Sequence, residues 1–129
     1  NFFGQSKSIN RNSFSDYIIS NIEKKKKIKL AANIFFNPLH LNFLNRVILK
    51  LVKKKITGIF NVGSKNYISK YNFAVSLAKK YKLDKKYIIK YISIFKKDSR
   101  PLNTFMHTNK LIKKIKIKMP LIEDGIKLL

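Results

Sequence analysis

Cysteine and tryptophan are absent from this chain of 129 residues, which has only three prolines and four glycines. Without cysteine the chain can form neither a disulfide framework nor a thiolate metal site, and a reducing compartment is permitted. The glycines Gly4, Gly58, Gly63 and Gly125 match neither dinucleotide-binding nor P-loop spacing. The chain therefore lacks a glycine-rich loop that could hold nucleotide phosphates.

Long apolar runs are missing as well. No segment reaches the roughly 18 apolar residues that cross a bilayer, and the N-terminus has no signal-peptide pattern. We therefore expect a soluble, cytoplasmic protein without a membrane partner. The chain begins at Asn1 instead of Met, and we expect that truncation, rather than processing, has removed a preceding region.

Acidic residues and histidines are scarce, which limits the chemistry that the chain can perform. The six Asp and Glu residues are scattered, and the two histidines are His40 and His107. A hydrolytic or acid–base site needs a nucleophile, a base and an orienting group, and a metal site needs clustered ligands. We therefore expect no catalytic residue and no metal site here, and a surface or capping role for both histidines.

Positive charge is abundant, with 29 Lys and Arg residues against six acidic ones and a net charge of +23. Only Arg11, Arg46 and Arg100 are arginines, which leaves 26 lysines beside many Ile, Asn, Phe and Tyr residues. This composition is typical of A- and T-rich codons, so solvated surface lysine is favoured over a selected nucleic-acid patch. A small nucleic-acid-binding protein stays an alternative, and its binding would weaken steeply with salt.

Apolar periodicity alternates between helical and extended segments along the whole chain. We expect helices from Ser13 or Ser15 to about residue 26, after an N-cap at Asn42, after a cap at Ser69, after a cap at Thr108, and over 123–129. Extended segments are expected at 28–30, 56–62 and 101–106, and a short helix or strand at 87–95. This order with short connections predicts an α/β protein.

The segment from Thr57 to Ser64 is the most informative part of this pattern. It predicts a strand that is apolar on both faces, a turn at Gly63, and a cap at Ser64 for the following helix. Phe73 and Tyr81 lie on the expected inward face of that helix. Strand–turn–helix units of this kind often form one wall of a ligand site.

Arg100 is the best candidate for an anion contact from its residue type alone. A guanidinium group can bond two phosphate oxygens at once, and Pro101 stiffens the loop that follows. Ligand contact and structural anchoring of the loop are equally compatible with this position. Arg11 and Arg46 are weaker candidates, because Arg46 falls within an amphipathic helix.

Five short motifs occur in a characteristic order: Asn-Phe-Phe-Gly at 1–4, Asn-Pro-Leu-His-Leu-Asn-Phe-Leu at 37–44, Thr-Gly-Ile-Phe-Asn-Val-Gly-Ser at 57–64, Arg-Pro-Leu-Asn-Thr at 100–104 and Thr-Asn-Lys-Leu at 108–111. Together they resemble the C-terminal part of extended short-chain dehydrogenase/reductases acting on nucleotide sugars, most of all the dTDP-4-dehydrorhamnose reductases. The resemblance implies the C-terminal portion of a Rossmann-like α/β fold, with a small mixed α/β substrate-binding lobe. Residues 1–129 would be a fragment consisting of this substrate-binding region.

The resemblance also implies an N-terminal region that binds NAD(P)H and carries a catalytic Tyr-x-x-x-Lys with a Ser or Thr. These parts would precede Asn1. Tyr81 and Lys85 have the Tyr-x-x-x-Lys spacing only by chance, and we interpret Tyr81 as helix packing. We therefore expect the 129 residues alone to be inactive.

Four substrate-binding residues follow from the matched motifs. Asn1 would approach the sugar nucleotide, Asn37 and Pro38 would wall the sugar site, and Arg100 would bind the diphosphate. Phe2 and Gly4, by the same resemblance, would lie at the junction of nicotinamide and substrate.

The chain departs from the family at 41–44, where Leu-Asn-Phe-Leu replaces a frequent Val-Asp-Asp-Leu. The carboxylates of that family segment are therefore absent at 41–44. A nucleotide-sugar reductase is the leading hypothesis, and an epimerase or dehydratase that shares this region is the closest alternative. A structural module without a ligand is the third class. The sugar, the choice of NADH or NADPH and the oligomeric state stay open.

Overall fold

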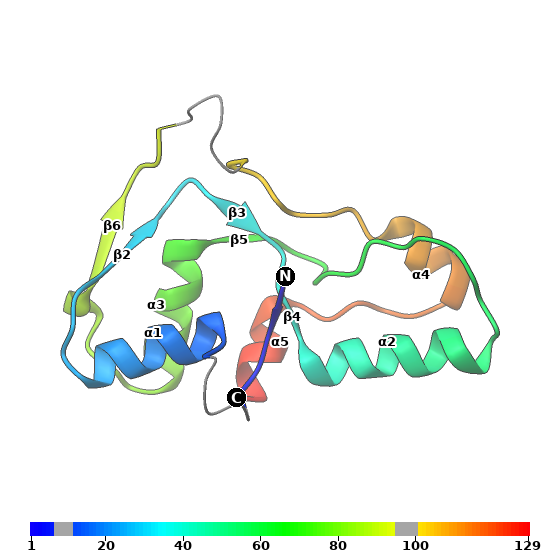
Figure 1. The fold of residues 1–129 in the computed structure, drawn as a ribbon, viewed down its shortest axis with the longest axis horizontal. Helices are drawn as coiled ribbons and strands as arrows, with labels where there is room; N and C mark the ends of the chain where they lie inside the picture. The colour runs from blue at the N-terminus through cyan, green and yellow to red at the C-terminus, as the bar shows by residue number, and fades with distance from the viewer. Residues whose placement is uncertain (7–11, 95–100) are drawn as a thin grey trace.

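The computed structural model describes residues 1–6, 12–94 and 101–129 and has a mixed α/β architecture (Figure 1). Its elements in chain order are β1 (Phe2–Phe3), α1 (Phe14–Glu23), β2 (Ile28–Ala31), β3 (Phe35–Phe36), β4 (Leu39–His40), α2 (Leu41–Lys53), β5 (Ile68–Ser69), α3 (Lys70–Lys80), a 3₁₀ turn (Lys85–Tyr87), β6 (Ile88–Tyr91), α4 (Asn109–Ile115) and α5 (Ile122–Lys127). The expected α/β class is confirmed.

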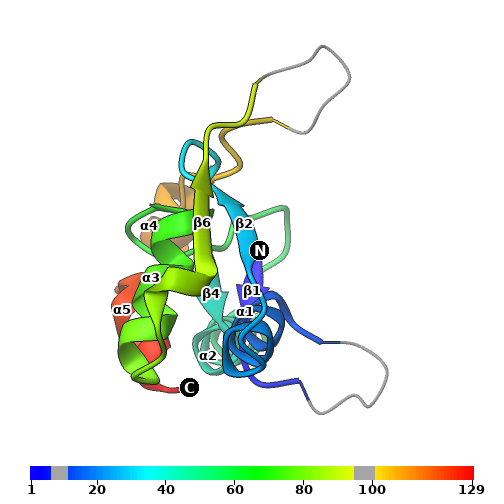
Figure 2. The ribbon, with the colours of Figure 1, turned by 90° about the vertical axis from the view of Figure 1, so that its left-hand side faces the viewer.

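The strands of the described residues pair two by two. β1 runs parallel to β4, with Phe3 opposite His40, and β2 runs parallel to β6. β3 and β5 are antiparallel, with Phe35 opposite Ser69, and an isolated bridge to Asn103 adds the chain that follows the second gap. Figure 2 shows β2 and β6 side by side above α1 and α3. These short pairs hold residues far apart in sequence around the centre of the molecule.

Two apolar clusters stabilise the chain. The larger one joins α1, α3 and α5 to the strands, and Phe73 lies fully buried within it. The smaller one lies between α2 and α4, which occupy the other end of the molecule in Figure 1, and contains Val47 and Leu111. Among the described residues no helix combines the length and the hydropathy that crossing a membrane would require.

Serine caps begin two of the helices: Ser13, one of the two starts that the sequence leaves open for α1, and Ser69, the predicted cap of α3. The Ser13 hydroxyl accepts a hydrogen bond from the Asp16 amide at 3.1 Å, and the Asp16 carboxylate accepts one from the Ser13 amide at 3.2 Å. The Ser69 hydroxyl accepts from the Asn72 amide at 3.1 Å in α3. Each cap satisfies amides that have no intrahelical partner, which stabilises a helix by about 1 kcal/mol.

Two expected caps are wrong, and a third, Thr108, occupies the N-cap position of α4 without the side-chain bond. Helix α2 is capped by His40, whose Nδ1 accepts from the Asn42 amide at 3.2 Å, so Asn42 lies inside the helix. Ser64 caps no helix, because the next helix, α3, begins only at Lys70; its hydroxyl donates to the Pro38 carbonyl instead. The His40 ring, and not the Asn42 side chain, therefore faces the first amides of α2, and the Ser64 hydroxyl is used in a tertiary contact.

The strand expected at 56–62 does not form. Ile56, Phe60 and Val62 pack against the cluster between α2 and α4, whereas Ile59 is 88% exposed. A strand needs a neighbour to accept and donate its backbone hydrogen bonds, and no described strand pairs with this segment. Apolar packing without a pairing partner therefore leaves it irregular.

Candidate functional site

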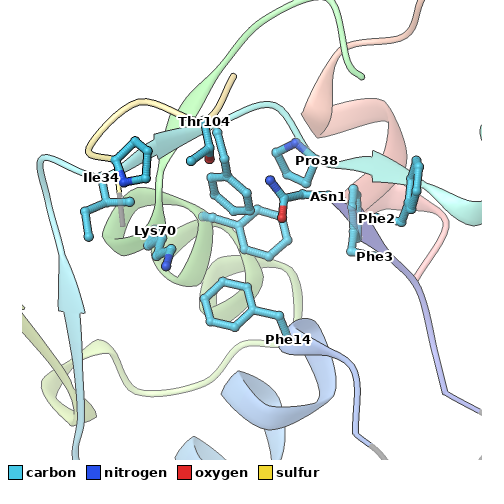
Figure 3. A pocket seen from close by; sticks show the side chains of 11 residues that line it. Asn1, Phe2, Phe3, Phe14, Ile34, Pro38, Lys70 and Thr104 are labelled. Carbon is cyan, nitrogen blue, oxygen red and sulfur yellow. The ribbon is translucent and has the colours of Figure 1, made fainter. Parts of the chain in front are cut away.

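A cavity of about 320 Å³ lies where β1, α1, β3 and α3 meet (Figure 3). Most of its lining consists of side chains without polar atoms: Phe2, Phe3, Phe14, Ile34, Phe36, Pro38, Phe73 and Pro101. The polar lining residues are Asn1, Lys70 and Thr104. A concave, largely apolar site with a few polar groups is the usual form of a small-molecule pocket.

Phe73 forms the centre of the aromatic packing beneath this cavity. Its ring meets Phe3 at 5.2 Å and Phe36 at 5.4 Å, both edge to face, and stacks against Phe14 at 6.0 Å. Such ring pairs contribute about 0.5–1.5 kcal/mol each beyond their buried area. Because residues from β1, β3, α1 and α3 share one aromatic centre, the apolar wall is already formed without a ligand.

The three polar residues are held in place through their backbones. The Asn1 carbonyl accepts from the Leu39 amide at 3.1 Å, and the Lys70 amide donates to the Ile34 carbonyl at 3.0 Å. The Thr104 amide and hydroxyl both donate to the Phe35 carbonyl, at 2.9 and 3.2 Å. Within residues 1–6, 12–94 and 101–129, no hydrogen bond uses the Asn1 side chain, the Lys70 ammonium group or the lone pairs of the Thr104 hydroxyl.

Asn37 lies directly before Pro38 and is 4% exposed. Its Nδ2 donates to the carbonyls of Ser64 at 3.2 Å and Met106 at 2.9 Å, and its Oδ1 accepts from the Met106 amide at 3.0 Å. Both amide hydrogens are therefore bonded to backbone. The side chain ties three distant segments of the chain together behind the pocket wall.

Gly63 and Ser64 complete the support of this wall. A Cβ atom at Gly63 would lie 2.5 Å from Nδ2 of Asn37, so any side chain there would collide with the Asn37 amide. The buried Ser64 hydroxyl donates to the Pro38 carbonyl. The turn that the sequence predicts at Gly63 thus fixes Asn37 and Pro38.

His40 connects the pocket to helix α2. It is 6% exposed, it caps α2 through Nδ1, and its ring meets Phe3 edge to face at 5.3 Å. Burial lowers the pKa of His40, because the charged imidazolium loses solvation there. The expected capping role is confirmed for His40, which is buried; His107 is exposed beside Phe105.

The pocket brings together three of the residues expected at the site: Asn1, Phe2 and Pro38. Asn37 lies behind them, with its amide bonded to backbone. Gly4 is buried, and a Cβ atom there would lie 3.0 Å from Leu41, so it faces that side chain.

Arg100 lies outside the described residues, although Pro101 beside it lines the pocket. The chance Tyr-x-x-x-Lys tyrosine, Tyr81, donates its hydroxyl to the Leu129 carbonyl at 3.0 Å. Neither Tyr81 nor Lys85 lines the pocket.

Sequence reasoning missed Phe14, Lys70 and Thr104 as pocket residues. Thr104 belongs to a motif on which the resemblance rests, so its position could have been inferred. Phe14 and Lys70 gave no signal, because an apolar residue at helical spacing indicates a core position and Lys70 is one of many lysines.

Comparison with known proteins gives two kinds of match. The family model described as RmlD substrate binding domain matches residues 2–129. No curated protein sequence matches the chain. Solved structures of nucleotide-sugar enzymes match over nearly its whole length, at identities of 20% or below in the three cases given next.

The dTDP-4-dehydrorhamnose reductase from Bacillus anthracis, solved in complex with NADP, matches with a TM-score of 0.83 and 19% identity, over 98% of this chain and 44% of that one. The reductase from Clostridium acetobutylicum gives 0.81 and 20%, over 98% and 44%. The dTDP-glucose 4,6-dehydratase from Bacillus anthracis, in complex with NAD, gives 0.75 and 16%, over 99% and 40%. The chain spans less than half the length of these proteins, and it has the fold of their corresponding part.

Proposed function

We propose that this chain, which belongs to the RmlD substrate binding domain family, is the substrate-binding region of an NAD(P)-dependent nucleotide-sugar reductase. In the complete enzyme a 4-keto sugar nucleotide would be reduced by hydride transfer. The cavity of about 320 Å³ between β1, α1, β3 and α3 is the observation that carries the proposal. It is the site in this chain where the family residues Asn1, Phe2 and Pro38 meet.

The lining of the cavity supports a sugar with few hydroxyl groups. Aromatic and proline side chains can cover the C–H faces and a methyl group of a deoxy sugar, but they offer no partner to an added hydroxyl. Asn1 and Thr104 supply the polar contacts that orient the ring. A 4-keto-6-deoxy sugar fits this lining better than a fully hydroxylated one.

The residues expected at the substrate take two kinds of role in this proposal. Asn1 and Pro38 contact the sugar, and Asn37 keeps Pro38 in position through its three backbone hydrogen bonds. Arg100, next to the pocket residue Pro101, is proposed as the diphosphate contact. Phe73 and the rings packed against it close one side of the cavity and exclude water from that side.

The chain's residues fit the edge of a cofactor site and not its phosphate-binding centre, because no glycine-rich loop is present in the sequence. Phe2, which is 47% exposed and lines the pocket, is proposed to contact the nicotinamide ring. Gly4 follows β1, and its missing side chain leaves room for the Leu41 side chain. NAD(P)H, when bound, supplies the hydride, and the catalytic tyrosine and lysine are expected in a preceding region. The isolated chain should therefore show no reductase activity.

The test uses the complete protein, with the region encoded upstream. Loss of NADPH or NADH absorbance on addition of dTDP-4-dehydrorhamnose supports the proposal, and Asn1→Ala should raise KM. A complete protein that oxidises neither cofactor with any 4-keto sugar nucleotide would overturn it.

An epimerase or dehydratase is the second candidate, favoured by the likeness to the solved dehydratase with a TM-score of 0.75. Those reactions return the hydride to the substrate, so product would form without net cofactor oxidation. Simultaneous measurement of sugar product and cofactor absorbance separates the two candidates.

A further inference from the structure

We propose that Lys70 is a second anion-binding residue of this site, in addition to Arg100, and takes up a phosphate group of the nucleotide sugar, an inference that rests on the proposed function. Lys70 is the first residue of α3 and lines the cavity. Figure 3 shows its side chain between Ile34 and Phe14. Nothing in the family resemblance or in the spacing of the sequence motifs distinguishes this lysine from the others.

Among the described residues that line the cavity, Lys70 is the one with a charged side chain, and none of the others is acidic. Its ammonium group makes no ion pair or hydrogen bond with the part of the chain that the structure describes, whereas Lys86 and Lys127 pair with Asp84 and Asp124. A half-buried cation against carbon surfaces has lost part of its hydration without gaining a counter-ion. An anionic ligand would supply this missing partner.

The side chain, and not the helix end, is the donor. The Lys70 amide is bonded to the Ile34 carbonyl and the Asn72 amide to the Ser69 hydroxyl, so these amides are already used. The positive end of the α3 dipole adds a favourable field in the first turn. An anion in the pocket would therefore be held mainly by the ammonium group.

A phosphate fits this position better than a neutral sugar group does. Lysine binds phosphate as a compact point charge with three donors, and the effective dielectric constant beside aromatic walls is lower than in water. The side chains of Asn1 and Thr104 are neutral and suit hydroxyl groups of a sugar. The pocket thus separates into a neutral part for the sugar and a cationic part, at the start of α3, for its phosphate.

Calorimetric titration of the complete protein, with the region encoded upstream, tests this assignment, with pyrophosphate, dTDP and dTDP-glucose as probes. Lys70→Gln should weaken dTDP binding about ten- to hundredfold, the usual effect of losing one charge-assisted hydrogen bond. Lys70→Arg should keep most of the affinity. The control is Lys79→Gln, which removes the same charge from the exposed last turn of the same helix and should change affinity less than about twofold.

Each outcome supports or overturns the assignment. Equal weakening by Lys70→Gln and Lys79→Gln would show that only the general positive field attracts the anion, and absence of dTDP and pyrophosphate binding would also refute the assignment. If pyrophosphate binding depends on Lys70 but dTDP-glucose binds no more tightly than dTDP, Lys70 is an anion-binding residue and the proposed function is refuted. If dTDP-glucose binds tightly and Lys70→Gln leaves its affinity unchanged, the proposed function is supported and the assignment of Lys70 is refuted. Circular dichroism checks that every variant keeps the helix content of the original chain.

Discussion

Replacement of Asn37 by Asp tests the support of the pocket wall most directly, because it changes one NH₂ group into an oxygen. Nδ2 lies 3.2 Å from the Ser64 carbonyl oxygen and 2.9 Å from that of Met106. In the variant a carboxylate oxygen would face both carbonyls. Only the bond from the Met106 amide to Oδ1, at 3.0 Å, would survive.

The expected losses in free energy of unfolding differ between Asn37→Ala and Asn37→Asp. Asn37→Ala removes three hydrogen bonds at about 1 kcal/mol each and should cost about 3 kcal/mol. Asn37→Asp loses two of these bonds. It also places a negative charge against two carbonyl oxygens at a position that is 4% exposed, so at neutral pH the loss in free energy of unfolding should be larger, about 4–5 kcal/mol. The isosteric change should therefore be worse than truncation.

The pH dependence gives this prediction its signature. The introduced carboxyl group has a raised pKa in the folded chain, because its neutral form can donate to one of the carbonyls. Its contribution to stability is complete below the pKa of about 3.9 in the unfolded chain and is lost as pH rises through the folded-state pKa. On acidification, the difference in free energy of unfolding between the original chain and Asn37→Asp should shrink toward about 1 kcal/mol.

Urea unfolding followed by circular dichroism, at several pH values, measures these differences. Asn33→Asp is the matched control, because Asn33 forms a similar amide pair with the Ser93 amide and carbonyl, at 2.8 and 2.9 Å, in a less buried position. It should lose only about 1 kcal/mol, since one donor is removed near solvent. An Asn37→Asp variant no less stable than Asn37→Ala, or a deficit independent of pH, would refute the reasoning.

Three further variants probe the same fold by urea unfolding. Because burial lowers the pKa of His40, the unfolded chain takes up the proton first, and stability should fall as pH drops below about 6.5; His40→Asn keeps a cap acceptor and should remove that part of the slope. Lys82→Gly should stabilise by about 0.5–1 kcal/mol, since Lys82 has φ 55°, whereas Lys79→Gly within the helix should destabilise by about 1 kcal/mol, and a shared sign would contradict this. Gly63→Ala should cost about 2 kcal/mol by displacing the Asn37 amide, and its combination with Asn37→Ala should cost less than the sum.

Local rules were sufficient to predict the helices. Ser69 was identified as a cap because a hydroxyl acceptor preceded an apolar helical pattern, and it makes the expected bond. Ser13 was one of two possible starts of the first helix, and it is the one that caps it. Asn42 failed because its residue type matched a cap, whereas the strand pair of β1 and β4 set the helix to begin after His40. A boundary set by pairing between distant segments cannot be read from one segment.

The same limit explains the strand and the pocket. Residues 56–62 have the composition of a buried strand, but pairing depends on a neighbour that is not in the described chain. Asn1 and Pro38 were predicted through family motifs, and both line the cavity. Lys70 was not, because its place in the cavity results from the antiparallel pairing of β3 with β5, which brings the start of α3 beside Ile34.

The position of the lysines separates composition from function. Lys25, Lys55, Lys82 and Lys116 have φ values of 56, 50, 55 and 49° at or just after helix ends, where glycine avoids the steric cost of a left-handed backbone. The lysine charge is not needed for that backbone geometry, so these residues reflect lysine enrichment that tolerates local strain. The same lysine enrichment accounts for most of the net charge of +23, so that charge alone does not indicate a binding partner. Lys70 differs in a way that composition does not explain. Pairing between distant strands has placed it in the lining of an apolar cavity, where its ammonium group has no counter-ion in the described part of the chain.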